Sequence, residues 1–139
     1  MRWENTVTID APAQRVWDLT IGVTNWPSFT PTVQKLERLE SGPMQVGSRA
    51  RIKQPGQTAA IWTVTRLAPG REFAWQTKRM GVTMTGTHRV EPTDSGCRNT
   101  LAIDVAGPGS RLFGMLFGPL LRKAIATENA ALRDEARRD

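Results

Sequence analysis

The sequence predicts an α+β fold, in which an antiparallel sheet carries its helices on one face. Three observations support this prediction. Residues 3–10 alternate between apolar and polar side chains, six runs rich in Val, Thr, Ile and Trp follow from about residue 36, and residues 110–137 have a helical pattern. The chain has 139 residues, which is the length of one domain. We therefore expect a single domain over residues 1–139.

The N-terminal segment is predicted to form one strand and two short helical pieces. The alternation over residues 3–10 is typical of a half-buried strand. Asp10 or a neighbour is expected to cap a short helix that has Pro12 in its first turn and ends near Gly22. A break at residues 25–27 is expected to separate this helix from a second short helical or irregular piece.

The middle of the chain is predicted to contain six strands joined by short turns. Turn-forming residues occur at Pro55-Gly56, at Pro69-Gly70, at Gly81 and at residues 92–96. Short connections between successive strands favour antiparallel pairing, because parallel strands need long crossovers. The segment 107–109, Gly-Pro-Gly, is expected to end the sheet.

Residues 110–137 are predicted to form a long helix whose two halves differ. The first half, SRLFGMLFGPLL, is almost wholly apolar, and the second half is charged and strongly helix-forming. Pro119 is expected to bend the helix, because proline lacks the backbone N–H and clashes with the preceding turn. We expect the apolar half to face the interior and the residues from Arg122 onward to be partly solvated.

The composition narrows the possible functions. The formal net charge is +6, from 19 basic and 13 acidic residues. Cys97 is the only cysteine and His88 the only histidine, so the sequence predicts no disulfide within the chain, no metal site and no cofactor. No signal peptide and no apolar run of about 18 residues is present, and we expect a soluble, cytoplasmic protein without a transmembrane segment.

A nucleic-acid partner is not expected, although the chain is basic. Arg49, Arg51 and Lys53 would share one face of a strand, as a phosphate-binding stripe requires. However, no aromatic residue for base stacking occurs between Gly47 and Gln57. The pattern favours a solvated sheet face, with a phosphate-binding stripe as the less favoured alternative.

Four segments of the chain carry a resemblance to a known family. They are VTIDAPAQRVWDLTIGVTNWPSF, WTVTRLAPGREFAW, HRVEPTDSGCR and GPGSRLFGMLFGPLLRKAIATENAALRDEA. With the order of the elements, they resemble the SRPBCC or START-like superfamily, and within it the polyketide cyclase/dehydrase-like branch. The resemblance implies a helix-grip fold: a seven-stranded antiparallel sheet wraps the long C-terminal helix, two short helices follow the first strand, and a cavity lies between sheet and helix.

The alternation in the strands predicts which side chains would line that cavity. The strands are expected to contribute Trp62, Phe73, Trp75, Met84, His88 and Asn99, and the long helix is expected to contribute Leu112, Met115 and Leu116. Trp26 and Phe29 are expected near its mouth. His88 or Asn99 would hold a polar group of the ligand, and no inward-facing carboxylate is predicted beside them.

Three functions from different classes remain open. The first is the binding or carriage of a small hydrophobic molecule, including aromatic, polyketide-like or lipid-like ones. The second is an enzyme of the cyclase, dehydratase or isomerase type, with His88 as the candidate acid–base residue and a second polar group near it. The third is a module that binds an acidic protein or RNA through its basic face. The sequence leaves the ligand and the oligomeric state open.

Overall fold

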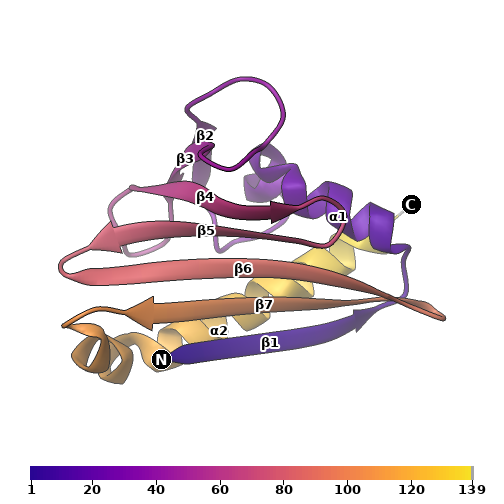
Figure 1. Ribbon diagram of the computed structural model, residues 1–139. Coiled ribbons are helices and arrows are strands. Elements are labelled where there is room, and N and C mark those ends of the chain that lie inside the picture. Colours follow the sequence, from indigo (N-terminus) through magenta and orange to yellow (C-terminus); the bar gives the residue numbers. More distant parts are fainter. Residues whose placement is uncertain (139) are drawn as a thin grey trace.

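A computed structural model describes residues 1–138 of the chain (Figure 1). Seven strands form one antiparallel sheet in the order β1-β7-β6-β5-β4-β3-β2. The elements are β1 (Arg2–Ile9), α1 (Ala13–Ile21), the 3-10 helix η1 (Val23–Ser28), β2 (Lys35–Arg38), β3 (Arg49–Lys53), β4 (Ala60–Ala68), β5 (Glu72–Arg79), β6 (Val82–Thr93), β7 (Gly96–Ala106) and α2 (Ser110–Ala136). The predicted α+β, helix-grip architecture is confirmed. The predicted domain ends at residue 139, which lies outside the described residues.

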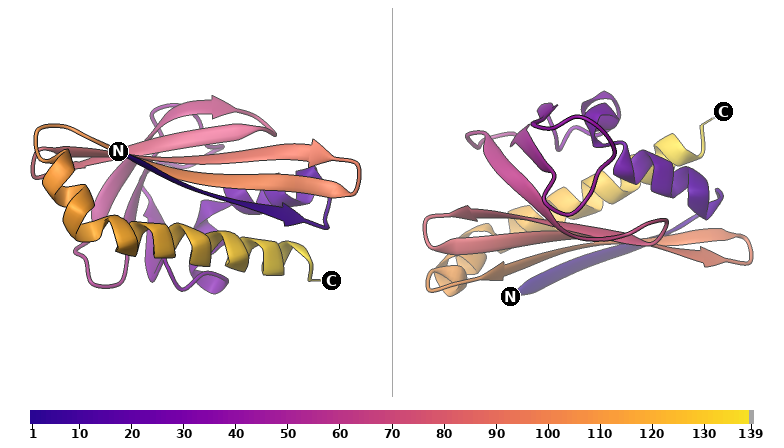
Figure 2. Two further views of the ribbon diagram at one scale, coloured as in Figure 1. Left: turned by 90° about the horizontal axis from the view of Figure 1, so that it is seen from below. Right: turned by 45° about the horizontal axis from the view of Figure 1, so that its top comes forward.

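The long helix α2 crosses one face of the sheet (Figures 1 and 2). Figure 1 shows α1 near the C-terminal end of α2, whereas the start of α2 lies at the opposite end of the sheet, near the hairpin that joins β5 to β6. Apolar side chains of the sheet, α1 and η1 form the core, and Ile9, Val16 and Phe73 are fully buried. The start of α2 therefore lies away from the helices that close the other end.

Two features attach α2 to the sheet. A Cβ atom placed on Gly118 would lie 2.9 Å from the Trp3 ring, so glycine allows the helix to approach β1 closely. Further along, the buried Asn129 side chain accepts a hydrogen bond from Asn99 on β7 at 2.8 Å and donates to the Asn5 side chain on β1 at 2.9 Å. Since Asn129 is fully buried, these bonds offset the cost of burying its amide.

The N-terminal half of α2 is bent and exposed. Figure 2 shows the bend in the orange part of the helix, while the helix runs without a break from Ser110 to Ala136 and contains Pro119. The expectation that this half turns its apolar side chains inward holds only in part, because Leu112, Leu116 and Leu120 remain largely exposed. No helix within residues 1–138 is long and apolar enough to cross a membrane.

Two local predictions in the N-terminal segment are wrong. The N-cap of α1 is Pro12, and no side chain makes a cap hydrogen bond there. Asp10 lies two residues before the cap position, too early to reach the first free N–H groups. The break expected at residues 25–27 lies inside η1, where backbone bonds from Asn25 to Gly22 and from Phe29 to Trp26 flank Pro27 and keep the turn helical.

Candidate functional site

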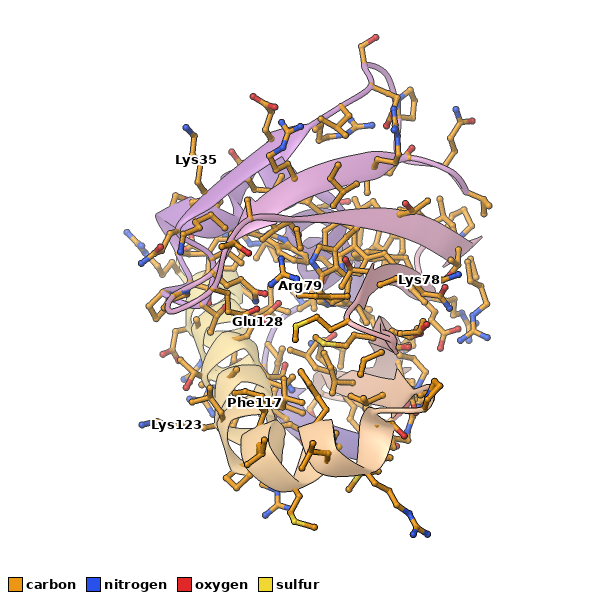
Figure 3. The ribbon with its side chains drawn as sticks, turned by 90° about the vertical axis from the view of Figure 1, so that its left-hand side faces the viewer. Lys35, Lys78, Arg79, Phe117, Lys123 and Glu128 are labelled. Carbon is orange, nitrogen blue, oxygen red and sulfur yellow. The ribbon has the colours of Figure 1, made fainter. Side chains whose placement is uncertain are left out.

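A cavity of about 560 Å³ opens between the sheet and the N-terminal half of α2. Its walls come from the segment between β3 and β4, from the ends of β5 and β6 that meet in a hairpin, and from α2. Figure 3 looks toward this end of the molecule, with Arg79 on the sheet side and Phe117 on the helix side. Most of the lining side chains are apolar; they include Ile52, Ala60, Trp62, Met84, Leu112, Phe113, Leu116 and Leu121. We call this space the outer cavity.

A smaller space of about 100 Å³ adjoins the outer cavity and lies deeper between sheet and helix. Both spaces are lined by Ile52, Trp62, Met84 and Leu121, so the two are neighbours. The deeper space, the inner cavity, adds the side chains of Trp26, Trp75, His88 and Glu128. A ligand entering through the mainly apolar outer cavity would therefore meet the imidazole of His88 and the carboxyl of Glu128 only at its inner end.

His88 forms part of the wall of the inner cavity from β6. Its ring stacks on Phe73 with 4.7 Å between ring centroids and lies 5.1 Å from the centroid of Trp26. Burial among these rings lowers the pKa of His88 to about 3, because the charged imidazolium loses its hydration. Within residues 1–138 no protein group forms a hydrogen bond with the imidazole. His88 is therefore neutral at ordinary pH, with one ring nitrogen able to donate and one able to accept.

Glu128 reaches the inner cavity from α2 and lines the same space as His88. Figure 3 shows it farther along the helix than Phe117. Its Oε2 accepts a hydrogen bond from the Thr32 hydroxyl at 3.4 Å. Burial raises the pKa of Glu128 to about 7, and the Thr32 hydroxyl opposes this shift. The carboxyl is therefore close to half ionised near neutral pH, as a group that takes up and releases protons requires.

Sequence reasoning missed Glu128 because it treated the charged half of α2 as solvated. A signal for its inward position was nevertheless present. Glu128 lies at helical spacing from Leu121, Ile125 and Leu132, which form the apolar side of the helix. A single carboxylate in an apolar stripe of a helix marks a candidate for an inward-facing acid.

Most of the sequence-predicted site residues lie on the two cavities. Trp62 and Met84 line both spaces, and Trp75 and His88 line the inner one. Leu112 and Leu116 line the outer cavity. Trp26 lies beside His88 at the inner end rather than near the mouth, because η1 covers that end of the sheet. Phe29 borders a space of only about 10 Å³ next to His88.

Three of the sequence-predicted residues lie outside the cavity walls. Phe73 is fully buried behind His88 and supports its ring. Asn99 is also fully buried, and its amide donates to Asn129 instead of facing the cavity. Met115 is 75% exposed on the outer side of α2. Period-two and helical spacing identify a face, but they do not separate a cavity wall from the packed core behind it or from solvent.

The inner cavity can hold and activate a polar group on an otherwise apolar molecule. The neutral His88 ring can donate a hydrogen bond to a carbonyl or hydroxyl oxygen. The Glu128 carboxyl can exchange a proton with a neighbouring atom near neutral pH. Within residues 1–138 no three His, Cys, Asp or Glu side chains are grouped as a metal site would need.

The sequence matches one family model over nearly its whole length. The family is described as polyketide cyclase / dehydrase and lipid transport, and the match covers residues 2–137. No curated protein matches the sequence.

Solved structures with the same fold include two aromatase/cyclases. The Zhui aromatase/cyclase of Streptomyces sp. R1128 has a TM-score of 0.80 at 24% identity, over 99% of this chain and 94% of that chain. The di-domain ARO/CYC protein BexL from the BE-7585A biosynthetic pathway has a TM-score of 0.77 at 24% identity, over 96% of this chain and 45% of that one. The hypothetical protein jhp0584 from Helicobacter pylori has a TM-score of 0.84 at 11% identity, over 99% and 88% of the two chains. At these identities the likeness shows the fold.

Proposed function

The chain belongs to the polyketide cyclase / dehydrase and lipid transport family, and from this premise we propose that it binds a small, mostly apolar molecule between the sheet and α2. The ligand's apolar body would occupy the outer cavity, and one polar group would lie at the inner end between His88 and Glu128. The family and the fold are consistent with a hydrophobic ligand-binding or cyclase role.

The observation that carries this proposal is that the lining changes from mainly apolar side chains in the outer cavity to an imidazole and a carboxyl in the inner cavity. The outer space of about 560 Å³ is within the range of small-molecule sites and is lined mainly by apolar side chains. The inner space contributes both a neutral imidazole and a carboxyl with a raised pKa. Such an arrangement orients a molecule by one polar end while burial of its apolar surface, at about 25 cal/mol per Å², supplies the affinity.

A titration with 1-naphthol, a flat apolar molecule with one hydroxyl, tests the proposal. Binding should quench tryptophan fluorescence, since Trp62 and Trp75 line the cavity, and it should depend weakly on salt. Ala60→Phe places a ring in the outer cavity and should weaken binding by about tenfold or more. Ile61→Phe is the matched control, because Ile61 is the next residue of β4 and is exposed on the opposite face. Equal affinity of the two variants would contradict the proposal.

A second candidate function is a dehydratase or cyclase, and Glu128 favours it. An acid–base mechanism at His88 requires a second polar group within reach, and Glu128 lines the same inner cavity. The two groups also have pKa values that burial moves apart, to about 3 for His88 and about 7 for Glu128. This separation gives them different roles near neutral pH.

The loss of water from a β-hydroxy ketone illustrates the roles that Glu128 and His88 would have. The Glu128 carboxylate removes the proton from the carbon between the two oxygen-bearing carbons, and the C–H electron pair forms an enolate. The neutral His88 N–H donates a hydrogen bond to the enolate oxygen. Glu128, now protonated, gives its proton to the departing hydroxyl, the C–O bond breaks, and an unsaturated ketone and water are released.

The dehydration of 4-hydroxy-4-phenylbutan-2-one, followed by the absorbance of the conjugated product, tests this candidate. An enzyme should lose about a hundredfold or more in turnover with Glu128→Gln or His88→Ala, while 1-naphthol binding changes by only about fivefold. If the protein is a carrier, the Glu128→Gln and His88→Ala variants should bind 1-naphthol about as well as the wild type. The wild type should then show no turnover above that of the Ala60→Phe variant. Turnover and 1-naphthol binding together therefore distinguish an enzyme from a carrier.

A further inference from the structure

Most of the exposed large apolar side chains in residues 1–138 gather around the mouth of the outer cavity. Met80 is 92% exposed at the tip of the β5–β6 hairpin, and Met115 and Leu116 are 75% and 64% exposed on α2. The hairpin tip lies against the start of α2, since a Cβ on Gly107 would lie 2.3 Å from the Gly81 carbonyl oxygen. We call this surface the mouth face; it comprises Met80, Leu112, Met115, Leu116 and Leu120. Patches of this kind on a soluble domain mark interaction sites.

Cations surround the mouth face, and no carboxylate accompanies them. Lys78 and Arg79 precede Met80. Arg111 lies in the apolar half of α2, and Arg122 and Lys123 follow directly after that half. Figure 3 shows Lys78 and Lys123 on opposite flanks of Phe117. Segments 41–71, 73–90 and 105–127 contain no Asp or Glu. None of these five cations forms an ion pair with any residue of the described part of the chain.

The arrangement on α2 places the cations and the apolar residues on one outward side. Arg111 and Arg122 lie four residues before and seven residues after Met115, which is helical spacing. Helices with exposed apolar side chains and flanking Lys or Arg are typical of attachment to the surface of an anionic bilayer. The cations would lie at the level of the lipid phosphates, and the methionine and leucine side chains would enter the acyl boundary.

We propose that the mouth face docks on a bilayer surface that carries anionic phospholipids. The charge pattern argues against a second copy of this chain, because a twofold interface would bring the unpaired cations of both copies together. In the docked state the open end of the outer cavity faces the membrane, so an apolar molecule could pass between the two without crossing water. The docking does not depend on which molecule the cavity holds.

Co-sedimentation with lipid vesicles tests the proposal. The full chain should bind vesicles of phosphatidylcholine with about one third phosphatidylglycerol, and should bind pure phosphatidylcholine vesicles far more weakly. Neutralising two cations with Arg122→Gln/Lys123→Gln should weaken binding to the anionic vesicles by about 25-fold, at about fivefold for each charge. The control Lys35→Gln/Arg71→Gln has the same net charge and alters exposed cations elsewhere, and it should weaken binding by less than about threefold.

A second pair of variants tests the apolar part of the surface. Met115→Ser, at a residue outside the cavity lining, should weaken vesicle binding by about fivefold. Val46→Ser removes a similarly exposed side chain between β2 and β3 and should leave vesicle binding unchanged.

Four results would overturn the proposal. The first is equal binding to neutral and anionic vesicles. The second is an equal loss of vesicle binding in the test variants and in their controls. The third is binding to polyglutamate as tight as to anionic vesicles with no effect of Met115→Ser, which would identify an acidic protein as the partner. The fourth is a dimer at micromolar concentration that Met115→Ser dissociates, which would show that a second copy covers the face.

Discussion

Glu128 and His88 line the same inner cavity, yet burial moves their pKa values in opposite directions. Loss of hydration disfavours whichever form of a group is charged, so the acid becomes harder to ionise and the imidazole harder to protonate. Both side chains are consequently neutral over a range of pH in which exposed Glu and His would be charged. At mildly acidic pH these two groups therefore carry no charge into the inner cavity, which suits a mostly apolar ligand.

The raised pKa of Glu128 makes a prediction about stability. In the unfolded chain the carboxyl ionises near its ordinary pKa of 4.5, whereas in the folded protein it holds its proton up to about pH 7. The folded state is therefore favoured below pH 4.5, and this contribution is lost as the pH rises through 7. Glu128→Gln should be more stable than the wild type by about 3 kcal/mol at alkaline pH.

Urea unfolding of the two proteins across pH measures this effect. The difference in unfolding free energy between Glu128→Gln and the wild type should grow with pH from an acidic reference near pH 4, where it reports packing alone. A difference that stays constant from acid to alkaline pH would show that the carboxyl is well solvated. His88 acts with the opposite sign, since its lowered pKa costs stability as the pH falls from 6.5 toward 3.

At the scale of single residues, the sequence could predict which side of a strand a residue occupies. Met84 and His88 alternate with threonines on β6, and both line the inner cavity. The sequence could not predict how far inward a residue lies. Trp26 and Asn99 are buried at the places where η1 and α2 cover the sheet, and these contacts join segments far apart in the chain.

At the scale of elements, α2 divides into an anchored half and an exposed half. The C-terminal half is fixed by Asn129, whose amide bonds to both β1 and β7. The N-terminal half approaches the sheet through Gly114 and Gly118 and turns several leucines outward. The composition of the two halves was visible in the sequence, but their exposure was not, because it depends on whether another element covers the helix.

Asn129→Ala should destabilise the protein strongly. The substitution leaves the buried Asn99 amide and the Asn5 side chain without their partner, and an unsatisfied buried polar group costs more than the bond itself contributed. We expect a loss of about 3 kcal/mol in unfolding free energy, measured by urea denaturation.

Gln14→Ala is the control for that measurement. Gln14 also donates a side-chain hydrogen bond, to Asp18 at 2.8 Å, but on the exposed surface of α1. Its loss should cost less than about 0.5 kcal/mol. Comparable losses in the two variants would show that the Asn129 bonds contribute no more than a surface bond.

At the scale of the whole molecule, the basic residues do not form one continuous surface. On β3, Arg49 is paired with Glu40 at 2.8 Å and Arg51 with Glu37 at 2.7 Å. The charges of Arg49 and Arg51 are therefore balanced by neighbouring carboxylates, whereas the cations around the mouth of the cavity have no such partner within residues 1–138. The sequence predicted the shared face of Arg49 and Arg51, whereas their carboxylate partners depend on the pairing of β2 with β3.

We expect that β3 does not bind nucleic acid. Binding of single-stranded RNA to the wild type at physiological salt should be weak, and Arg49→Gln/Arg51→Gln should change it by less than about threefold. Electrophoretic mobility shifts at two salt concentrations measure this. Tight binding that the double variant abolishes would make the phosphate-binding alternative correct.

The order of strands and helices was predictable because each local signal agrees with the same architecture. Alternation in β1, the glycine turns between the later strands and the apolar spacing in α2 together favour an antiparallel sheet with a covering helix. The cavity itself is not a local property, since it depends on the space left between Trp62, Met84 and α2 after folding. The family resemblance implied it, and the structure gives its walls.

The most direct test of ligand binding in the cavity is an NMR measurement on protein whose methionine methyl groups carry carbon-13. Intermolecular NOEs from 1-naphthol protons should reach the methyl group of Met84, which lines both the outer and the inner cavity. Met44 and Met115 lie outside both linings and should show none. NOEs to Met115 without any to Met84 would place the ligand on the surface and contradict the account.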